Sequence, residues 1–128
     1  MDKKLIIVGA ILGMIAIVLG AFGAYALKNV LTVEQLNTFE TGVKYQMYHA
    51  LFLMFVANSQ MITQKIKKTI LILVSLGVLF FSGSIYLLAT NNLTTFDFKI
   101  IGFITPIGGL LLITGWIFVI VNFFNKKS

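Results

Sequence analysis

Three long apolar runs constrain this chain more than any other feature. Each run holds about 20 residues, the length that an α-helix needs to cross the hydrocarbon core of a bilayer. Of the 128 residues, 59% are apolar and only 11% are charged, whereas soluble domains carry about 25% charged residues. The composition excludes an ordinary soluble domain and predicts an integral membrane protein.

The apolar runs and the turn residues between them predict a single transmembrane domain over residues 1–128 with four spans. The spans are expected at about residues 5–27, 43–61, 69–89 and 100–124. The second span is the least hydrophobic, and a short amphipathic helix over residues 33–42 is expected to lead into it. Thr32 and Gln35 have the spacing of a capping box that opens this helix. Because short connections make neighbouring helices antiparallel, the predicted fold class is an all-α, up-down-up-down four-helix bundle.

The first run also has the basic start and the Ala24-Tyr25-Ala26 ending of a signal peptide. Its apolar part is longer than the 7–15 residues, roughly, that a signal peptide normally has. Small residues repeat along one face of this helix at intervals of three and four: Gly9, Gly13, Ala16, Gly20, Gly23 and Ala24. Such a stripe lets another helix approach closely, which a discarded segment would not need. We expect the segment to be retained as the first span.

Lysine positions set the expected orientation, because positive charges near span ends are kept on the cytoplasmic side. The N-terminus, the connection over residues 62–69 and the C-terminus together hold seven lysines. The opposite side holds three, which are Lys28, Lys44 and Lys99. Both termini are therefore expected in the cytoplasm, as an even number of spans requires.

Composition also excludes several classes of function. The net charge of +6 comes from lysines alone, so the arginine forks that read phosphates and guanines are missing, and nucleic acid is not an expected partner. Without cysteine the chain has no disulfide, thiolate metal site or iron–sulfur cluster. One histidine and four acidic residues are too few for a dedicated metal site. We expect neither a metal nor a cofactor.

Polar side chains gather in the predicted outer half of the membrane, where a rise of about 1.5 Å per residue places parts of all four spans at one level. His49 is the single ionisable residue expected below the interface, and such a residue needs partners inside the bundle. Its candidate partners are Tyr86, Ser82, Ser84 and Thr105. The candidate polar cluster as a whole comprises Tyr45, Gln46, His49, Ser82, Ser84, Tyr86, Thr105 and Pro106.

Pro106 lies within the expected fourth span and lacks a backbone donor. We expect it to kink this span and to free the carbonyl of Gly102, which a neighbouring group or water must then satisfy. The hydroxyl and amide side chains of the cluster are also common in the hydrogen bonds that join membrane helices. A purely structural role therefore stays open beside a polar pocket.

Several segments together resemble a bacterial family of small inner-membrane proteins known as domain of unknown function 423. They follow in matching order over nearly the whole chain: Gly20-Ala21-Phe22-Gly23-Ala24, residues 41–49, 81–86 and 105–109, and Gly115-Trp116. The resemblance implies a four-helix protein of the bacterial plasma membrane and brings no established activity. Family members often have histidine directly after the Gly-Ala-Phe-Gly-Ala segment, where this chain has Tyr25. A two-histidine relay or metal site is therefore not expected here.

Three functions stay open from the sequence. The first is a non-enzymatic accessory or assembly protein that contacts lipid, a second copy or another membrane protein, which the small-residue stripe favours if it faces outward. The second is binding or transport of a small molecule or lipid by an oligomer, through an outer-half pocket with His49, Gln46 and Tyr86. The third is an intramembrane hydrolase in which Ser82 or Ser84 attacks with His49 as base, although no catalytic motif surrounds these serines. We expect the first function and no enzymatic activity.

Overall fold

The computed structural model of the protein describes residues 1–93 and 102–125. These residues form four α-helices and one short 3-10 helix: α1 (Asp2–Tyr25), α2 (Val33–Asn58), α3 (Gln64–Ala89), η1 (Asn91–Leu93) and α4 (Ile104–Phe124). They contain no strand, so the predicted all-α fold class is confirmed for the described part of the chain. The expected start of the fourth span at residues 100–101, together with Asp97, Lys99 and the last two lysines, lies outside the described residues.

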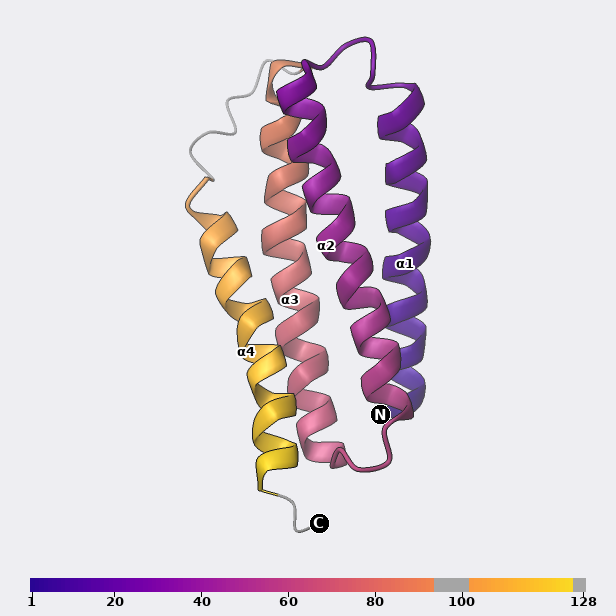
Figure 1. The fold of residues 1–128 in the computed structure, drawn as a ribbon, viewed down its shortest axis with the longest axis vertical. Helices are drawn as coiled ribbons and strands as arrows, with labels where there is room; N and C mark the ends of the chain where they lie inside the picture. Colours follow the sequence, from indigo (N-terminus) through magenta and orange to yellow (C-terminus); the bar gives the residue numbers. More distant parts are fainter. Residues whose placement is uncertain (94–101, 126–128) are drawn as a thin grey trace.

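Successive helices run in opposite directions, side by side (Figure 1). α2 and α3 form the middle of the bundle, while α1 packs on α2 and α4 packs on α3 at the two edges. The first residue of α1 and the last residue of α4 lie at the same end of the bundle, here termed the terminal end. The opposite end, where α1 connects to α2, is termed the loop end. The up-down-up-down arrangement predicted from the sequence is confirmed.

Three of the helices, α1, α3 and α4, are each long and apolar enough to cross a membrane. The remaining helix, α2, is the least apolar of the four, as the sequence indicates. Its side chains Gln46 and His49 are buried between the other helices. Because α2 runs alongside α1 and α3 (Figure 1), a membrane that these two helices cross is also crossed by α2.

The capping box predicted at the start of α2 is confirmed. Thr32 Oγ1 accepts the Gln35 backbone N–H at 3.1 Å, and Gln35 Oε1 accepts the Thr32 backbone N–H at 3.0 Å. From this cap α2 runs without interruption to Asn58. The expected lead-in over residues 33–42 and the apolar segment that follows are therefore one continuous helix.

The small-residue stripe of α1 packs against α2. Its four glycines each lie where an added Cβ atom would contact α2: Gly9, Gly13, Gly20 and Gly23. The approach is closest at Gly9, where the Cβ atom would lie 2.8 Å from the carbonyl oxygen of Ala50. Ala16 is fully buried, whereas Ala24 is exposed. The predicted close approach is confirmed, but its partner is a helix of the same chain, so the stripe does not face outward.

Glycines also allow α3 and α4 to pack closely. A Cβ atom at Gly108 would lie 2.3 Å from the backbone nitrogen of Phe81, so no side chain fits at this position. Two turns further along α4, a Cβ atom at Gly115 would lie 2.9 Å from the Val74 side chain. These contacts set the height of α4 against α3 and, with it, the heights of the α4 side chains that face α2.

Pro106 lies in the first turn of α4, which begins at Ile104. The first four N–H groups of a helix have no intrahelical partner, so a proline here removes no helical hydrogen bond. Gly102 lies in a turn before the helix. The predicted kink and the freed Gly102 carbonyl are therefore wrong, because the helix starts later than the apolar pattern indicates.

An ion pair ties α1 to α3 at the terminal end. Lys67 Nζ donates to Asp2 Oδ1 at 2.8 Å and to the Ala57 carbonyl at 3.2 Å. The amide of Gln64 donates to the same Asp2 oxygen at 3.1 Å. The Lys67 side chain is 1% exposed, whereas that of Asp2 is 50% exposed. This cluster joins α1 directly to α3, which otherwise contact each other little because both pack mainly on α2.

Candidate functional site

Two serines of α3 form the layer of interhelical hydrogen bonds nearest the loop end. Ser82 Oγ donates to the Gly42 carbonyl of α2 at 2.7 Å. The Ser84 hydroxyl is hydrogen bonded to the Thr105 hydroxyl of α4 and lies 3.0 Å from the Phe81 carbonyl of its own helix. Both serines are buried. Their hydroxyl groups therefore join α3 to its two neighbours.

Gln46 forms a second layer in the interior and joins three helices. Its Nε2 donates to the Leu12 carbonyl of α1 at 2.8 Å, and its Oε1 accepts the Tyr86 hydroxyl of α3 at 2.7 Å. The residue is 3% exposed. The sequence places Gln46 and Tyr86 in one candidate cluster, and the structure brings them into direct contact.

His49 lies about one turn nearer the terminal end and pairs with α4. Trp116 Nε1 donates to His49 Nε2 at 3.0 Å. Because an indole nitrogen can only donate, Nε2 accepts, and the neutral imidazole carries its proton on Nδ1. Nδ1 lies 2.6 Å from the Tyr45 carbonyl and donates to it. Both ring nitrogens of His49 are therefore satisfied within the protein.

The partners predicted for His49 are wrong. Among the described residues, none of the four candidates forms a hydrogen bond with it. Ser82 meets α2 at Gly42, seven residues before His49, which is about 10 Å along the helix axis. The candidate cluster therefore does not share one level, since the two serines lie near the loop end and His49 lies deeper in the bundle.

Trp116, the observed partner of His49, is not among the partners expected from the sequence. Its ring stacks on Phe52 of α2, with ring centroids 4.1 Å apart and 29° between the planes. It also meets the His49 ring edge-on, with centroids 6.0 Å apart. The distances of the two residues from the ends of their helices indicate this contact. His49 lies nine residues before the end of α2, and Trp116 lies eight residues before the end of α4. Both helices end at the terminal end, so the two residues lie at nearly the same height.

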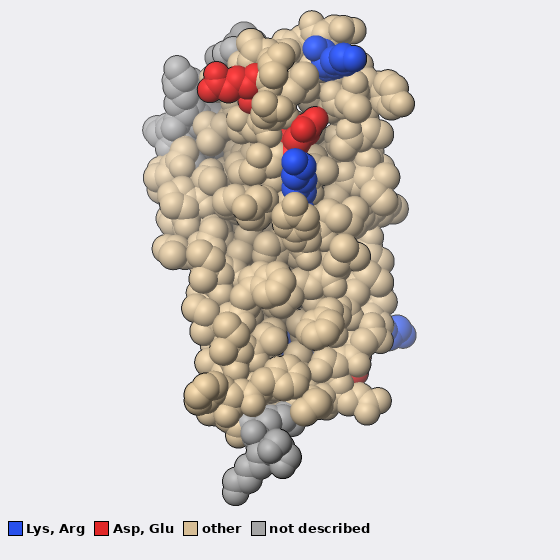
Figure 2. All heavy atoms as spheres, in the orientation of Figure 1, with Lys and Arg blue, Asp and Glu red and all other residues tan. Residues whose placement is uncertain are grey.

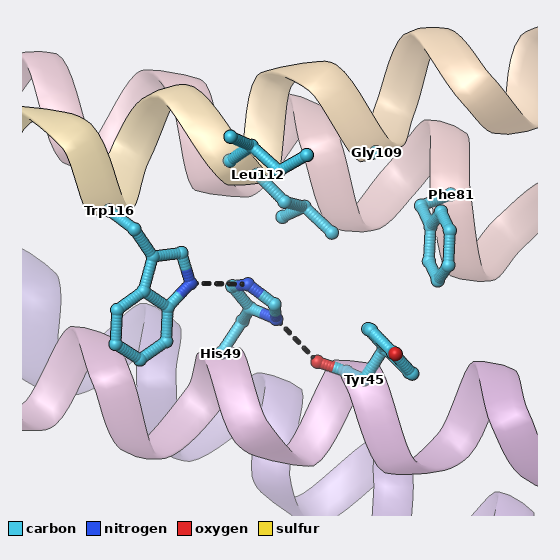
Figure 3. Close-up of a pocket in the computed structure, with 7 residues that line it drawn as sticks. Tyr45, His49, Phe81, Gly109, Leu112 and Trp116 are labelled. Carbon is cyan, nitrogen blue, oxygen red and sulfur yellow. Dashed lines mark hydrogen bonds between the residues drawn. The ribbon is translucent and has the colours of Figure 1, made fainter.

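A cavity of about 280 Å³ lies beside the His49–Trp116 pair. Figure 3 shows Trp116 and His49 toward one end of this cavity, Tyr45 and Phe81 at the other, and Leu112 between them. The complete lining comes from α2, α3 and α4: Tyr45, His49, Phe81, Gly109, Leu112, Ile113 and Trp116. Tyr45 and Ile113 are 42% and 58% exposed, so the cavity is open to the surface of the bundle. Its walls are hydrocarbon and aromatic rings, apart from the satisfied imidazole and the tyrosine hydroxyl.

The site lacks the arrangement that nucleophilic catalysis requires. Neither Ser82 nor Ser84 is hydrogen bonded to His49, and the serine hydroxyls instead contact backbone carbonyls and Thr105. Within the described ranges, no three histidine, cysteine or acidic side chains lie close enough to hold a metal ion. The lining of the cavity is mostly apolar, and both ring nitrogens of His49 beside it are hydrogen bonded within the protein.

Comparison with known proteins identifies the family. The family model described as "Protein of unknown function (DUF423)" matches residues 19–109. The UPF0382 membrane protein SSP2132 of Staphylococcus saprophyticus is 40% identical over 123 residues, which cover 96% of this chain and 98% of that protein. The UPF0382 membrane protein YwdK of Bacillus subtilis is 39% identical, with 93% of this chain and 94% of that protein covered. The UPF0382 inner membrane protein YgdD of Escherichia coli is 31% identical, with 98% and 93% covered. No solved structure matches the chain.

The matched segment contains the Gly-Ala-Phe-Gly-Ala sequence, His49, both serines and Gly109. It therefore covers most of the residues that line the cavity and all the residues of the two interhelical layers on α2 and α3. The resemblance noted in the sequence is confirmed. The names of the relatives do not state a biochemical function. This chain is a membrane protein that belongs to the DUF423 family.

Proposed function

We propose that the protein is a non-enzymatic membrane protein that binds the apolar chain of a lipid, or a small molecule of similar shape, in the cavity between α2, α3 and α4. One observation carries this proposal. The cavity has apolar and aromatic walls and opens on the side of the bundle, beside α3 and α4, which are both long and apolar enough to cross a membrane. A ligand would therefore enter from the bilayer rather than from water.

The dimensions of the cavity favour a single chain. Its lining on α4 extends from Gly109 to Trp116, seven residues apart, which is about 10 Å along the helix axis. Its volume of about 280 Å³ is slightly below the range of roughly 300–1,000 Å³ for pockets that enclose a whole small molecule. An elongated apolar cavity of this size fits one segment of an acyl or isoprenoid chain, with the remainder of the molecule in the bilayer.

The satisfied polar groups support a non-enzymatic role. Both nitrogens of His49 are hydrogen bonded, so the imidazole is not free to act as a base without breaking its contact with Trp116 or Tyr45. The family and its relatives carry no enzymatic name. Both findings agree with the absence of a catalytic motif around Ser82 and Ser84.

A second candidate function, assembly with another membrane protein or a second copy, receives different support. The small-residue stripe of α1 no longer favours it, because the stripe packs within the chain. The feature that supports assembly is the exposed face of α2. It carries charged and amide side chains that face away from the other helices and are available to another protein.

We further propose that the protein lies in the bacterial cell membrane with both termini in the cytoplasm. The terminal end carries Lys3, Lys4, Lys65 and Lys68, which are exposed, and positive charge favours the cytoplasmic side. Because the chain has no cysteine, single cysteines report orientation cleanly. Asn29→Cys should react with an impermeant thiol reagent in intact cells, and Lys65→Cys only after permeabilisation. The reverse labelling would overturn the proposed orientation.

Filling the cavity tests the binding proposal. A Cβ atom at Gly109 would lie 3.6 Å from the Phe81 ring, an ordinary contact, so Gly109→Leu directs its side chain into the cavity without a backbone clash. The matched control is Gly83→Leu, because Gly83 has no atom within 4 Å of its Cβ position and lines two other cavities.

Native mass spectrometry should show a lipid retained by the wild-type protein and by Gly83→Leu, and lost in Gly109→Leu. The single tryptophan, Trp116, provides a second measurement, because phospholipids with brominated chains quench a ring that they contact. Quenching should fall in Gly109→Leu relative to Gly83→Leu. Equal lipid retention and equal quenching in the two folded variants would refute binding in this cavity.

A further inference from the structure

A second cavity, of about 450 Å³, is lined by α1, α2 and α3 and is termed the α1–α3 cavity. It exists because α1 and α3 both pack mainly on α2 and contact each other little. Ile15 of α1 and Leu79 of α3 line it and are 39% and 63% exposed, so the cavity is open to the surface of the bundle. Most of the lining is aliphatic and none of it is charged, but three members are polar: Gln46, Ser75 and Tyr86. Its volume lies within the range of roughly 300–1,000 Å³ for pockets that bind small molecules.

Ser75 differs from the other hydroxyl residues of the described helices, because its hydroxyl forms no hydrogen bond with a described residue. A serine or threonine within a helix can bond the carbonyl four residues earlier, as Thr69 and Thr114 do. The remaining serines and threonines within the described parts of the four α-helices are likewise hydrogen bonded. The Ser75 hydroxyl therefore has its hydrogen-bonding capacity left for another molecule.

Ser75 also lies at a depth where water does not supply the missing partner. It is eleven residues after the start of α3 and fourteen before its end, near the middle of the helix. Figure 2 shows charged side chains toward the upper end of the visible face and near its lower right edge, with an uncharged band between them. A hydroxyl at mid-height of a membrane-spanning helix is unfavourable without a hydrogen-bond partner.

Gln46 brings a second donor to the same cavity. Its amide has two N–H groups, of which one donates to the Leu12 carbonyl and the other has no partner in the described part of the chain. Ser82 meets α2 at Gly42, and α2 and α3 are antiparallel (Figure 1). Gln46 is four residues beyond Gly42 and Ser75 is seven residues before Ser82, so the two donors differ in height by about 5 Å. They are close enough for one small group to contact both.

We propose that the α1–α3 cavity binds an uncharged, lipid-soluble carbonyl compound of the quinone type, whose carbonyl oxygen accepts the Ser75 hydroxyl and the second N–H of Gln46. A carbonyl oxygen has two lone pairs and accepts from both donors. A carboxylate or phosphate would have no opposite charge in the lining at this depth, which is unfavourable. A pure hydrocarbon would leave both donors without a partner. The ligand and the cavity differ from those of the proposed lipid chain, so neither proposal depends on the other.

Native mass spectrometry of the full chain in detergent tests the hydrogen bonds, with a fully alkylated decylbenzoquinone as the probe. The matched probe is the alkylbenzene of the same skeleton, which lacks both oxygens. The wild-type protein should bind the quinone at least fivefold more tightly than the alkylbenzene. Ser75→Ala should weaken quinone binding about fivefold, the value of one hydrogen bond, whereas Ser75→Thr keeps the hydroxyl and should bind as the wild-type protein does.

Thr114→Ala is the matched control, because it removes a hydroxyl that is already bonded within its own helix. It should bind the quinone as the wild-type protein does. Since the Ser75 hydroxyl contacts no described polar group, Ser75→Ala should preserve the fold, and circular dichroism of each variant checks this. Equal binding of the two probes by the wild-type protein, or equal quinone binding by Ser75→Ala and Thr114→Ala, would overturn the proposal.

Gly83→Leu and Gly109→Leu distinguish the two cavities. Gly83 lines the α1–α3 cavity and has no atom within 4 Å of its Cβ position, whereas Gly109 lines the cavity between α2, α3 and α4. Quinone binding should fall in Gly83→Leu and persist in Gly109→Leu, which is the reverse of the pattern expected for the retained lipid. The two ligands differ in mass, so one spectrum reports both. Loss of the quinone in Gly109→Leu with retention in Gly83→Leu would overturn this inference and leave the proposed function standing.

Discussion

Two adjacent glycines of α4 should respond oppositely to the same substitution. A Cβ atom at Gly108 would lie 2.3 Å from the Phe81 nitrogen and 2.8 Å from the Phe81 Cα and the Phe80 carbonyl carbon. These are backbone atoms, so no side-chain rotation relieves the clash. A Cβ atom at Gly109 would instead lie 3.6 Å from the Phe81 ring and border the cavity. Gly108→Ala should therefore force α3 and α4 apart, whereas Gly109→Ala should be accommodated.

The geometry sets the size of the effect. Restoring an ordinary contact of 3.4 Å at Gly108 requires the helices to separate by about 1 Å, which forfeits roughly a quarter to a half of the local dispersion energy. Over-packing costs about 1–3 kcal/mol, and a clash with backbone belongs at the upper end of that range. We expect Gly108→Ala to lower the free energy of unfolding by about 3 kcal/mol. Gly109→Ala should leave it unchanged or raise it by up to about 1 kcal/mol, because alanine favours the helix.

The assay is equilibrium unfolding in mixed micelles with increasing dodecyl sulfate, followed by the fluorescence of Trp116. Its ring contacts His49 and Phe52 of α2, so the signal reports the separation of α4 from the bundle. A loss of about 3 kcal/mol changes the unfolding equilibrium constant by roughly 150-fold. The same midpoint for Gly108→Ala, Gly109→Ala and the wild-type protein would refute the packing described for α3 and α4.

Four further substitutions, two of them combined in a double variant, test the polar contacts. His49→Leu should shift the emission of Trp116 to shorter wavelengths, because the indole N–H loses its acceptor; an unchanged spectrum would contradict the hydrogen bond. Gln46→Leu removes two interhelical hydrogen bonds and should lower the free energy of unfolding by about 1–2 kcal/mol in the same micelle assay, and no change would refute its central role. Asp2→Ala should destabilise the protein because it leaves the buried Lys67 charge uncompensated, and adding Lys67→Met should recover part of the loss; equal instability of the single and double variants would contradict this account.

Local features of the chain were predictable because they depend on neighbouring residues. The apolar runs define the helices, and the Thr32–Gln35 spacing defines the start of α2. The glycine stripe indicates that α1 approaches another helix closely, but its spacing holds no information on which helix this is. The close approach of Gly9 to Ala50 identifies α2 as that partner, so the stripe is an internal contact and not an external interface.

Contacts between helices were less predictable because they depend on relative heights. An error of a few residues in a span boundary moves a side chain by several ångströms, since each residue adds about 1.5 Å. Depths counted from the expected ends of the spans place His49 at the level of the two serines, whereas Ser82 meets α2 at Gly42, seven residues before His49. The same kind of error applies to Pro106, because apolar residues before Ile104 do not reveal where α4 starts. The ends of α2 and α4 lie together at the terminal end, and counting residues back from these ends places His49 and Trp116 at nearly the same height.

The polar character of α2 has two separate physical causes. Gln46 and His49 are buried and hydrogen bonded within the bundle, so they impose no cost at the lipid boundary and explain why a less apolar helix can cross the membrane between apolar neighbours. Glu40 and Lys44 are exposed on the half of α2 nearer the loop end and lie one helical turn apart in the order that favours attraction, so the two opposite charges stabilise each other at the surface of the helix.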